Sequence, residues 1–156
     1  MGCEGWVFYL SVGGVLSVKL VVYVSEDIRE TFKKQRIIPM ATSSKDGVPN
    51  VIYVGMWWWE DDETLCVANN YLNKTLSNIH ENQKVSFISW VREEGKSASY
   101  QIKCSAEEQL EGDLYQKMRK VATERERPLP GRSVIVCKVD AVYQGSGGKG
   151  AGDKLA

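Results

Sequence analysis

Apolar runs separated only by short polar turns occupy the middle of the chain, and they limit how it can fold. Residues 37–42 and 50–59 are two such runs, and the Asp46-Gly47 pair between them is a strong signal for a β-hairpin. A third run, residues 64–69, follows a polar turn at residues 60–63. Parallel strands need a long crossover connection, which these turns are too short to provide. The pattern therefore predicts an antiparallel meander of three strands.

Helical spacing of apolar residues appears at three places outside this meander. We expect one helix over residues 26–35, a short one that begins near Asn73, and one over residues 112–126. Ser25 and Asn73 are the expected caps of the first two helices, because their short polar side chains can accept hydrogen bonds from backbone N–H groups. A charged turn is expected at residues 92–96. Apolar patterns predict three more strands, over residues 84–91, 99–110 and 133–143.

These elements together predict a mainly β fold. Most strands are joined by hairpins, which disfavours a doubly wound parallel sheet of the nucleotide-binding type. A six-stranded antiparallel β-barrel with small peripheral helices removes the exposed edges that an open sheet would leave. The length of 156 residues suits one such domain. We place it at residues 25–144, after an apolar N-terminal extension at residues 1–24 and before an irregular, glycine-rich tail at residues 145–156.

The N-terminal extension approaches the length of a membrane span. Residues 6–24 are broken by a single charge, Lys19. No basic region precedes them, and Glu4 stands where positive charge is typical of a signal segment. The segment is rich in valine and aromatic residues and has a central Gly13-Gly14 pair, which is typical of two short strands. Two strands, or a wrongly assigned start of the chain, are therefore favoured over a membrane anchor, and we expect the protein in the cytoplasm.

Charge and cysteine usage disfavour several functional classes. The chain has 20 basic and 20 acidic residues, a balance that does not indicate a nucleic-acid partner. The four cysteines stand far apart, and together with His80, the single histidine, they form no metal-binding pattern, so no metal is expected. Cys66, Cys104 and Cys137 lie in apolar stretches, where a free cysteine packs as a small apolar residue. His80 lies on the second predicted helix, where we expect it to be partly exposed.

Lys74 and Thr75 stand at the start of the second predicted helix. A helix start offers N–H groups without an intrahelical acceptor and a partial positive charge, which together favour an anion. The ammonium group of Lys74 and the hydroxyl of Thr75 add a charge and a donor that suit phosphate. The alternative is an ordinary helix that Asn73 caps and whose Lys74 is solvated, and such helix starts are common.

Three neighbouring features on the predicted strands could also serve a ligand. Glycine weakens a strand unless a group approaches its backbone closely, so Gly55 indicates either a planar ring against Tyr53-Val54-Gly55 or a β-bulge. Trp57, Trp58 and Trp59 cannot all face inward, because strand side chains alternate. At least one is therefore expected on the surface or at a subunit interface. Ser99, Gln101 and Lys103 form a polar row that faces either solvent or a cofactor at a dimer interface.

Three stretches of the chain resemble the pyridoxamine 5′-phosphate oxidase-like, FMN-binding split-barrel proteins, and in particular their small archaeal and bacterial members. They read IIPMATSSKDGVPNVIYVG at residues 37–55, LCVANNYLNKTLSNIHENQKVSFISW at residues 65–90, and SYQIKCSAE at residues 99–107. The resemblance covers about three quarters of the chain and implies a six-stranded split β-barrel. It also implies a homodimer with FMN in a groove between the two subunits.

The resemblance further implies a set of FMN-binding residues. The family's positions that bind the FMN phosphate correspond to Lys74 and Thr75. The strand that lies along the isoalloxazine ring corresponds to Tyr53, Val54 and Gly55. The strand end beside the ribityl chain and ring corresponds to Val67, Ala68 and Asn69. The strand that reaches the cofactor from the other subunit corresponds to Ser99, Tyr100 and Gln101.

The C-terminal end departs from the family's pyridoxamine phosphate oxidases. Those enzymes carry an arginine- and histidine-rich substrate motif there, whereas this chain has no arginine after Arg132. Oxidation of pyridoxamine phosphate is therefore not expected. The resemblance implies an oxidoreductase that passes electrons or hydride through FMN to or from a small molecule. The alternatives are a non-catalytic FMN binder or electron carrier, and the same barrel holding a deazaflavin coenzyme or haem. The position of His80 on a helix speaks against haem.

Overall fold

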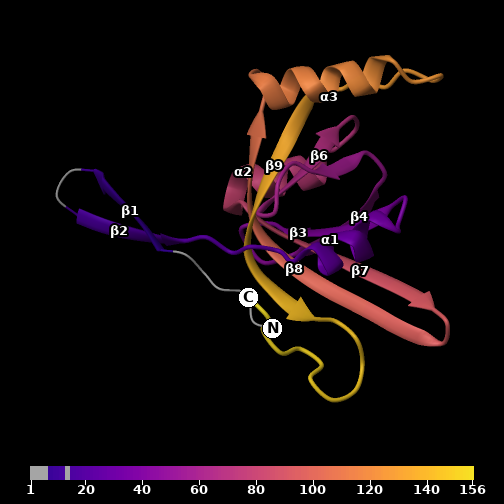
Figure 1. The fold of residues 1–156 in the computed structure, drawn as a ribbon. Coiled ribbons are helices and arrows are strands. Elements are labelled where there is room, and N and C mark those ends of the chain that lie inside the picture. Colours follow the sequence, from indigo (N-terminus) through magenta and orange to yellow (C-terminus); the bar gives the residue numbers. More distant parts are fainter. Residues whose placement is uncertain (1–6, 13–14) are drawn as a thin grey trace.

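The computed structural model describes residues 7–12 and 15–156, and these form three helices and nine strands (Figure 1). The helices are α1 (Glu26–Lys33), α2 (Lys74–Asn82) and α3 (Asp113–Thr123). The strands are β1 (Val7–Val12), β2 (Val15–Leu20), β3 (Ile38–Ser43), β4 (Pro49–Val54), β5 (Trp57–Trp59), β6 (Thr64–Asn69), β7 (Lys84–Glu93), β8 (Lys96–Gln109) and β9 (Ser133–Gln144).

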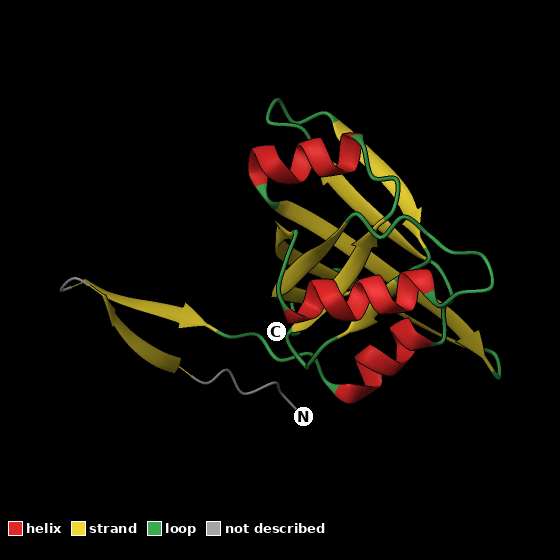
Figure 2. Cartoon of the chain, turned by 90° about the horizontal axis from the view of Figure 1, so that it is seen from above, coloured by secondary structure: helices red, strands yellow, loops and turns green. Residues whose placement is uncertain are grey.

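The N-terminal extension contains two short strands, as one interpretation of its sequence predicted. β1 and β2 pair in antiparallel register and form a sheet of their own. This hairpin projects away from the rest of the chain in two views (Figures 1 and 2). None of the described helices has the length and apolar character that crossing a membrane requires.

The other seven strands form one curled antiparallel sheet in the order β4-β3-β7-β8-β9-β6-β5. The mainly β, split-barrel fold is thus confirmed, with seven strands in place of six. The extra strand arises because the predicted strand at 50–59 breaks at Gly55 and Met56. Its halves lie at opposite edges of the sheet, so the predicted three-stranded meander is wrong. Two residues can span only about 11 Å between Val54 and Trp57, so the sheet must curl until its edges meet at this point.

The hairpin between β7 and β8 is tighter than the sequence predicted. Glu93 pairs with Lys96, so the turn contains only Glu94 and Gly95. Both have positive φ, 48° and 79°, which is the backbone of a type I′ turn. The right-handed twist of this turn matches that of the strands. The predicted turn at 92–96 is therefore mostly strand, and β8 begins three residues before the predicted start.

The three helices lie against the curled sheet (Figure 2). The main hydrophobic cluster includes residues of α1 and α2, and a second one includes residues of α3. Phe32 of α1 is fully buried, and its ring meets Trp57 and Trp59 edge-on at centroid distances of 6.5 and 5.9 Å. Trp58 points to the opposite side, where its Nε1 donates to Glu60 at 2.8 Å and the Lys117 ammonium lies over its ring. The three tryptophans thus do not all face inward, as the alternation predicted, and each of them is half-buried in the single chain.

The three cysteines in apolar stretches are free thiols buried in the sheet, as predicted. Burial raises the pKa of the Cys66 thiol to about 12 and that of Cys137 well above its ordinary value. Thiolates are therefore scarce at neutral pH, and these residues act as packing groups. Among the residues that the structure describes, no cluster of histidine, cysteine and acidic side chains could hold a metal ion.

The glycine-rich tail forms turns and folds back on the end of β9. The Leu155 N–H donates to the Val142 carbonyl at 2.8 Å, and Ala156 packs against the core. Gly145 allows this return, because a Cβ there would lie 2.5 Å from the Ser99 hydroxyl oxygen. The tail therefore buries Ser99 on β8.

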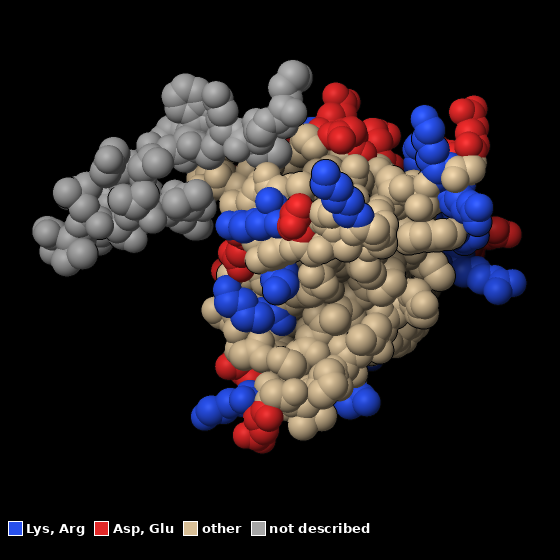
Figure 3. Space-filling view, turned by 90° about the horizontal axis from the view of Figure 1, so that it is seen from below, with Lys and Arg blue, Asp and Glu red and all other residues tan. Residues whose placement is uncertain are grey.

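Figure 3 shows a face on which acidic and basic side chains surround a largely uncharged centre.

Candidate functional site

A cleft of about 910 Å³ opens where the two edges of the curled sheet meet. Its size is within the range of small-molecule binding sites, about 300–1,000 Å³. It is lined by Arg36, Ile37, Ile52, Tyr53, Val54, Gly55, Met56, Ala68, Asn70, Tyr71, Leu72, Arg125 and Leu129. The cleft exists because β4 ends at one edge of the sheet and the chain crosses through Gly55 and Met56 to the other. The Ala68 N–H donates to the Met56 carbonyl at 2.9 Å and holds the crossing against β6.

The floor of this cleft is apolar, and its rim carries two tyrosines. Val54, Met56 and Ala68 are each less than a tenth exposed. Tyr53 and Tyr71 are 71% and 69% exposed, so their rings are available to a ligand. This combination of buried aliphatic groups and exposed aromatic rings suits the face of a planar ring system.

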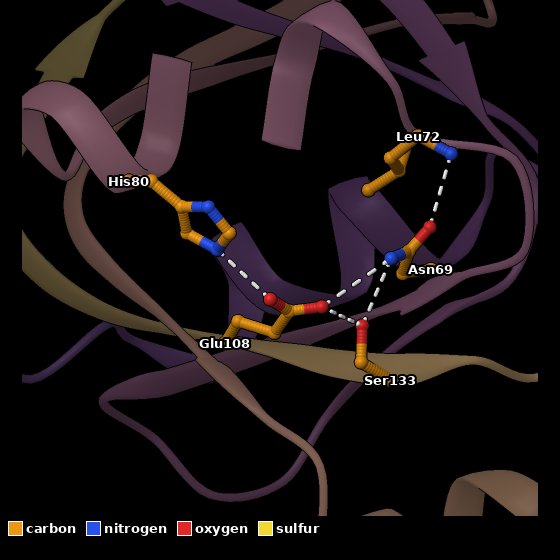
Figure 4. Close-up of polar contacts among 5 residues, drawn as sticks. All are labelled: Asn69, Leu72, His80, Glu108 and Ser133. Carbon is orange, nitrogen blue, oxygen red and sulfur yellow. Dashed lines mark hydrogen bonds and ion pairs between the residues drawn. The ribbon is translucent and has the colours of Figure 1, made fainter. Parts of the chain in front are cut away.

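Asn69 shapes the loop that forms one wall of the cleft (Figure 4). It is 2% exposed, and its side-chain oxygen accepts the Leu72 N–H at 3.0 Å. Its side-chain nitrogen donates to the Ser133 hydroxyl at 2.9 Å. The next residue, Asn70, accepts the Gly131 N–H at 3.0 Å. The polar atoms of Asn69 are thus committed to the fold, and its neighbours Asn70 and Leu72 face the cleft.

Glu108 is the centre of the polar network in Figure 4. The Ser133 hydroxyl donates to its Oε1, and His80 Nε2 lies 2.8 Å from its Oε2. Burial raises the pKa of the Glu108 carboxyl, but the hydrogen bonds from Ser133, His80 and Asn69 outweigh this effect and leave the pKa below its usual 4.5. His80 itself is half-exposed on α2, as predicted. The network ties α2, β6, β8 and β9 together behind the cleft.

Replacing Glu108 by glutamine is expected to lower stability in a pH-dependent way. A carboxyl whose pKa is depressed by folding stabilises the fold above its unfolded pKa, and this contribution is lost as pH falls through the lower folded pKa. Urea unfolding between pH 7 and acidic pH should therefore show a difference between wild type and Glu108→Gln that shrinks on acidification. Glu107→Gln, an exposed neighbour, is the control and should leave the pH profile unchanged. A constant difference at all pH values would contradict this prediction.

The start of α2 forms a second, smaller cavity beside β4. It measures about 210 Å³ and is lined by Ser44, Val48, Pro49, Asn50, Lys74, Ser77 and Asn78. Lys74 is exposed there, and no acidic residue occupies the first turn of the helix. Contrary to the prediction, neither Asn73 nor Ser25 makes a side-chain capping bond. The reason at α2 is that the preceding loop is held by Asn69 instead, which leaves the start of the helix without a side-chain cap.

Thr75, the next residue of α2, is 2% exposed and does not line this cavity. Its hydroxyl oxygen accepts the Asn50 side-chain amide at 3.0 Å, which leaves its proton to donate. Asn50 and Asn78 also donate to the Thr42 hydroxyl at 3.2 and 3.0 Å, so the amides around the helix start are held in place. A site with N–H groups, an ammonium and a hydroxyl is suited to an anion.

β4 contributes residues to both cavities. Strand residues two apart face the same side, so Asn50 at the small cavity aligns with Ile52 and Val54 at the cleft. A ligand with a planar ring and a phosphate could therefore follow one strand through both cavities. The structure thus places Tyr53, Val54, Gly55 and Ala68 in the cleft and Lys74 at the small cavity, with Thr75 buried beside it.

The remaining predicted site residues lie elsewhere in the single chain. Val67 is fully buried and belongs to the main core. Ser99 is buried under the tail, and its hydroxyl donates to the Ser89 carbonyl at 2.6 Å. Tyr100 packs against the core, and burial raises the pKa of its hydroxyl, helped by the charge of Asp27. Gln101 faces the outer side of the sheet, as does Ile88, its partner on β7.

Two arginines and a tyrosine are among the cleft residues that sequence reasoning missed. Arg36 and Arg125 follow helices α1 and α3, and Tyr71 lies in the loop before α2. No local pattern marks them, because charged and aromatic residues are common after helices and in loops. Tyr71 is additionally placed by Arg132, whose guanidinium lies 5.9 Å from the ring centroid.

Comparison with known proteins gives matches over most of the chain. Residues 24–145 match the family model described as pyridoxamine 5′-phosphate oxidase. An uncharacterized protein of Methanocaldococcus jannaschii is 33% identical over 138 residues, which are 87% of this chain and 90% of that protein.

Solved structures share the fold. An FMN-binding protein from Syntrophomonas wolfei superposes with a TM-score of 0.66 at 15% identity, over 76% of this chain and 83% of its own. HutZ, a haem storage protein from Vibrio cholerae, superposes with a TM-score of 0.59 at 15% identity, over 79% and 95%. Identities this low show the architecture alone. The family match and the archaeal relative go further, and they show that this chain belongs to the pyridoxamine 5′-phosphate oxidase family of split-barrel proteins.

Proposed function

We propose that this protein binds FMN along β4, with the ring system in the cleft and the phosphate at the start of α2. The observation that carries the proposal is that β4 contributes residues to both cavities, one with an apolar floor and the other with a basic helix start. Family membership and the FMN-binding relative from Syntrophomonas wolfei support it.

The residues present fit the parts of FMN. Val54, Gly55 and Ala68 offer a flat apolar surface, and Tyr53 can cover the ring from the rim. Lys74 and Thr75 would hold the phosphate. When bound, FMN supplies electron and hydride transfer, so the chain needs no nucleophile or base of its own for redox chemistry. The protein would then be an oxidoreductase, and an electron carrier without a substrate is the alternative.

The test is reconstitution. Purified protein mixed with FMN and then desalted should retain the visible flavin absorption bands and release FMN on denaturation. A deazaflavin coenzyme and haem are run in parallel. Retention of haem with a Soret band, and no retention of flavin, would overturn the proposal. Haem is disfavoured because His80, the single histidine of the chain, does not line the cleft and contacts Glu108.

The proposal includes a homodimer formed through the outer face of β4, β3, β7 and β8. This face exposes Val51, Tyr53, Ile88 and Trp90 to between 39% and 71%. Gln101 lies on the same face, because it pairs with Ile88 in the ladder. A second copy on this face would bring Gln101 of one subunit towards the cofactor site of the other. It would also cover an apolar surface that is exposed to solvent in the single chain.

Charge on this face should therefore disrupt the dimer. Trp90→Glu is expected to shift the protein from dimer to monomer in sedimentation velocity, because a carboxylate would be buried without a partner. Leu110→Glu, at a residue 66% exposed outside this face, is the matched control and should remain dimeric. A monomeric wild type would contradict this part of the proposal.

A further inference from the structure

The cleft contains two arginines that the flavin proposal leaves without a role. Arg36 lies in the link between α1 and β3, and Arg125 follows α3, so distant parts of the chain bring both side chains to one cavity. Among the described residues, no aspartate or glutamate lines this cleft. Its described lining therefore carries two positive charges and no negative one.

Neither arginine forms an ion pair with another residue that the structure describes. The ion pairs among the described residues involve lysines and His80 but neither of these guanidinium groups. Other arginines are used structurally: Arg29 donates to the Val24 carbonyl and Arg119 to the Pro130 carbonyl. Arg36 and Arg125 are exposed, so a ligand can reach their donors. Guanidinium groups suit carboxylates and phosphates because they can donate two parallel hydrogen bonds.

We propose that Arg36 and Arg125 form an anion-binding subsite in the cleft, and that the molecule which meets the flavin there carries a carboxylate or phosphate on an apolar or aromatic body. The apolar floor and the exposed ring of Tyr71 would take that body. The assignment of this molecule as the redox substrate rests on the proposed function, whereas anion binding does not.

The cofactor's own phosphate is a competing use for these arginines. It is disfavoured because Lys74 and the start of α2 lie at a separate cavity, and neither arginine lines that one. The cleft is also near the upper end of the range for small-molecule sites, about 300–1,000 Å³, which leaves room for a second small molecule beside a ring.

The test uses benzoate and phenyl phosphate as anionic probes and benzamide as a neutral one. Each is titrated into the FMN-loaded protein, with the flavin absorption spectrum as readout, and into the protein without FMN by calorimetry. Both anions should bind at least about tenfold more tightly than benzamide, the size of one charge-assisted hydrogen bond. Arg36→Gln and Arg125→Gln should each weaken anion binding by about tenfold or more and leave benzamide unaffected.

Arg127→Gln is the matched control, since Arg127 is exposed two residues from Arg125 and does not line the cleft. Circular dichroism checks that each variant folds. Equal binding of anions and benzamide, no binding of either anion, or no effect of the two substitutions would overturn the proposal. FMN affinity that falls in both variants while riboflavin affinity holds would instead assign the arginines to the cofactor's phosphate. If the protein does not retain FMN, the proposed function fails, and calorimetry still decides the anion subsite.

Discussion

Lys74→Ala should weaken FMN binding by about 1.5–3 kcal/mol, or roughly 10- to 150-fold in Kd, as expected for the loss of a charged hydrogen bond. Lys74 is exposed at the start of α2, and the first turn of this helix contains no acidic residue. The first-turn N–H groups would still favour the phosphate, so binding should be reduced and not abolished. Quenching of FMN fluorescence on titration with protein measures the change.

Riboflavin separates the phosphate contact from a general effect on the cleft. It lacks the phosphate, so its affinity should be the same in wild type and in Lys74→Ala. Lys120→Ala, an exposed lysine on α3, is the control for the loss of one positive charge and should bind FMN like wild type. A parallel loss of FMN and riboflavin binding would show that the substitution disturbs the helix, and unchanged FMN binding would place the phosphate elsewhere.

Phe32→Ala should destabilise the fold by about 3–5 kcal/mol, the usual cost of removing a buried aromatic ring. The Phe32 side chain is fully buried and contacts both Trp57 and Trp59, so its loss leaves a cavity between α1 and β5. A loss of this size is a large share of the stability of a typical domain, about 5–15 kcal/mol. Urea unfolding followed by tryptophan fluorescence measures it.

Val121→Ala on α3 is the comparison for this substitution. Val121 is 49% exposed, so its truncation should change the free energy of unfolding by less than about 0.5 kcal/mol. A decrease of less than about 1 kcal/mol in the free energy of unfolding of Phe32→Ala would mean that α1 is not packed against the tryptophans. Removal of a buried ring from a close-packed core costs more than this.

Several elements were predictable because their causes are local. The Asp46-Gly47 turn sets the β3–β4 hairpin, and its partner strands pair from Ile38 with Val54 to Ser43 with Pro49. The three helices follow from apolar spacing, with ends shifted by a few residues. The burial of Cys66, Cys104 and Cys137 follows from their apolar neighbours. The start of α2 at Lys74 was likewise visible as a helix start with a basic residue.

Other elements depended on contacts between distant residues. The run at residues 50–59 has one continuous strand pattern, yet β4 pairs with β3 and β5 pairs with β6 at the far edge of the sheet. Local periodicity carries no information about which partner a strand selects. The capping role expected of Asn73 was also wrong, since Asn69 holds the preceding loop through Ser133, a residue 64 positions away.

The sequence by itself thus determined the mainly β class, the hairpins, the helices and a basic helix start that suits phosphate. These properties arise from spacing and composition within a few residues. Only the tertiary structure decided that Gly55 and Met56 cross between the two edges of a curled sheet, and that a cleft opens there with Arg36 and Arg125 at its walls. The physical reason is that closure of the sheet joins strands far apart in the chain, and the cleft is a product of that closure.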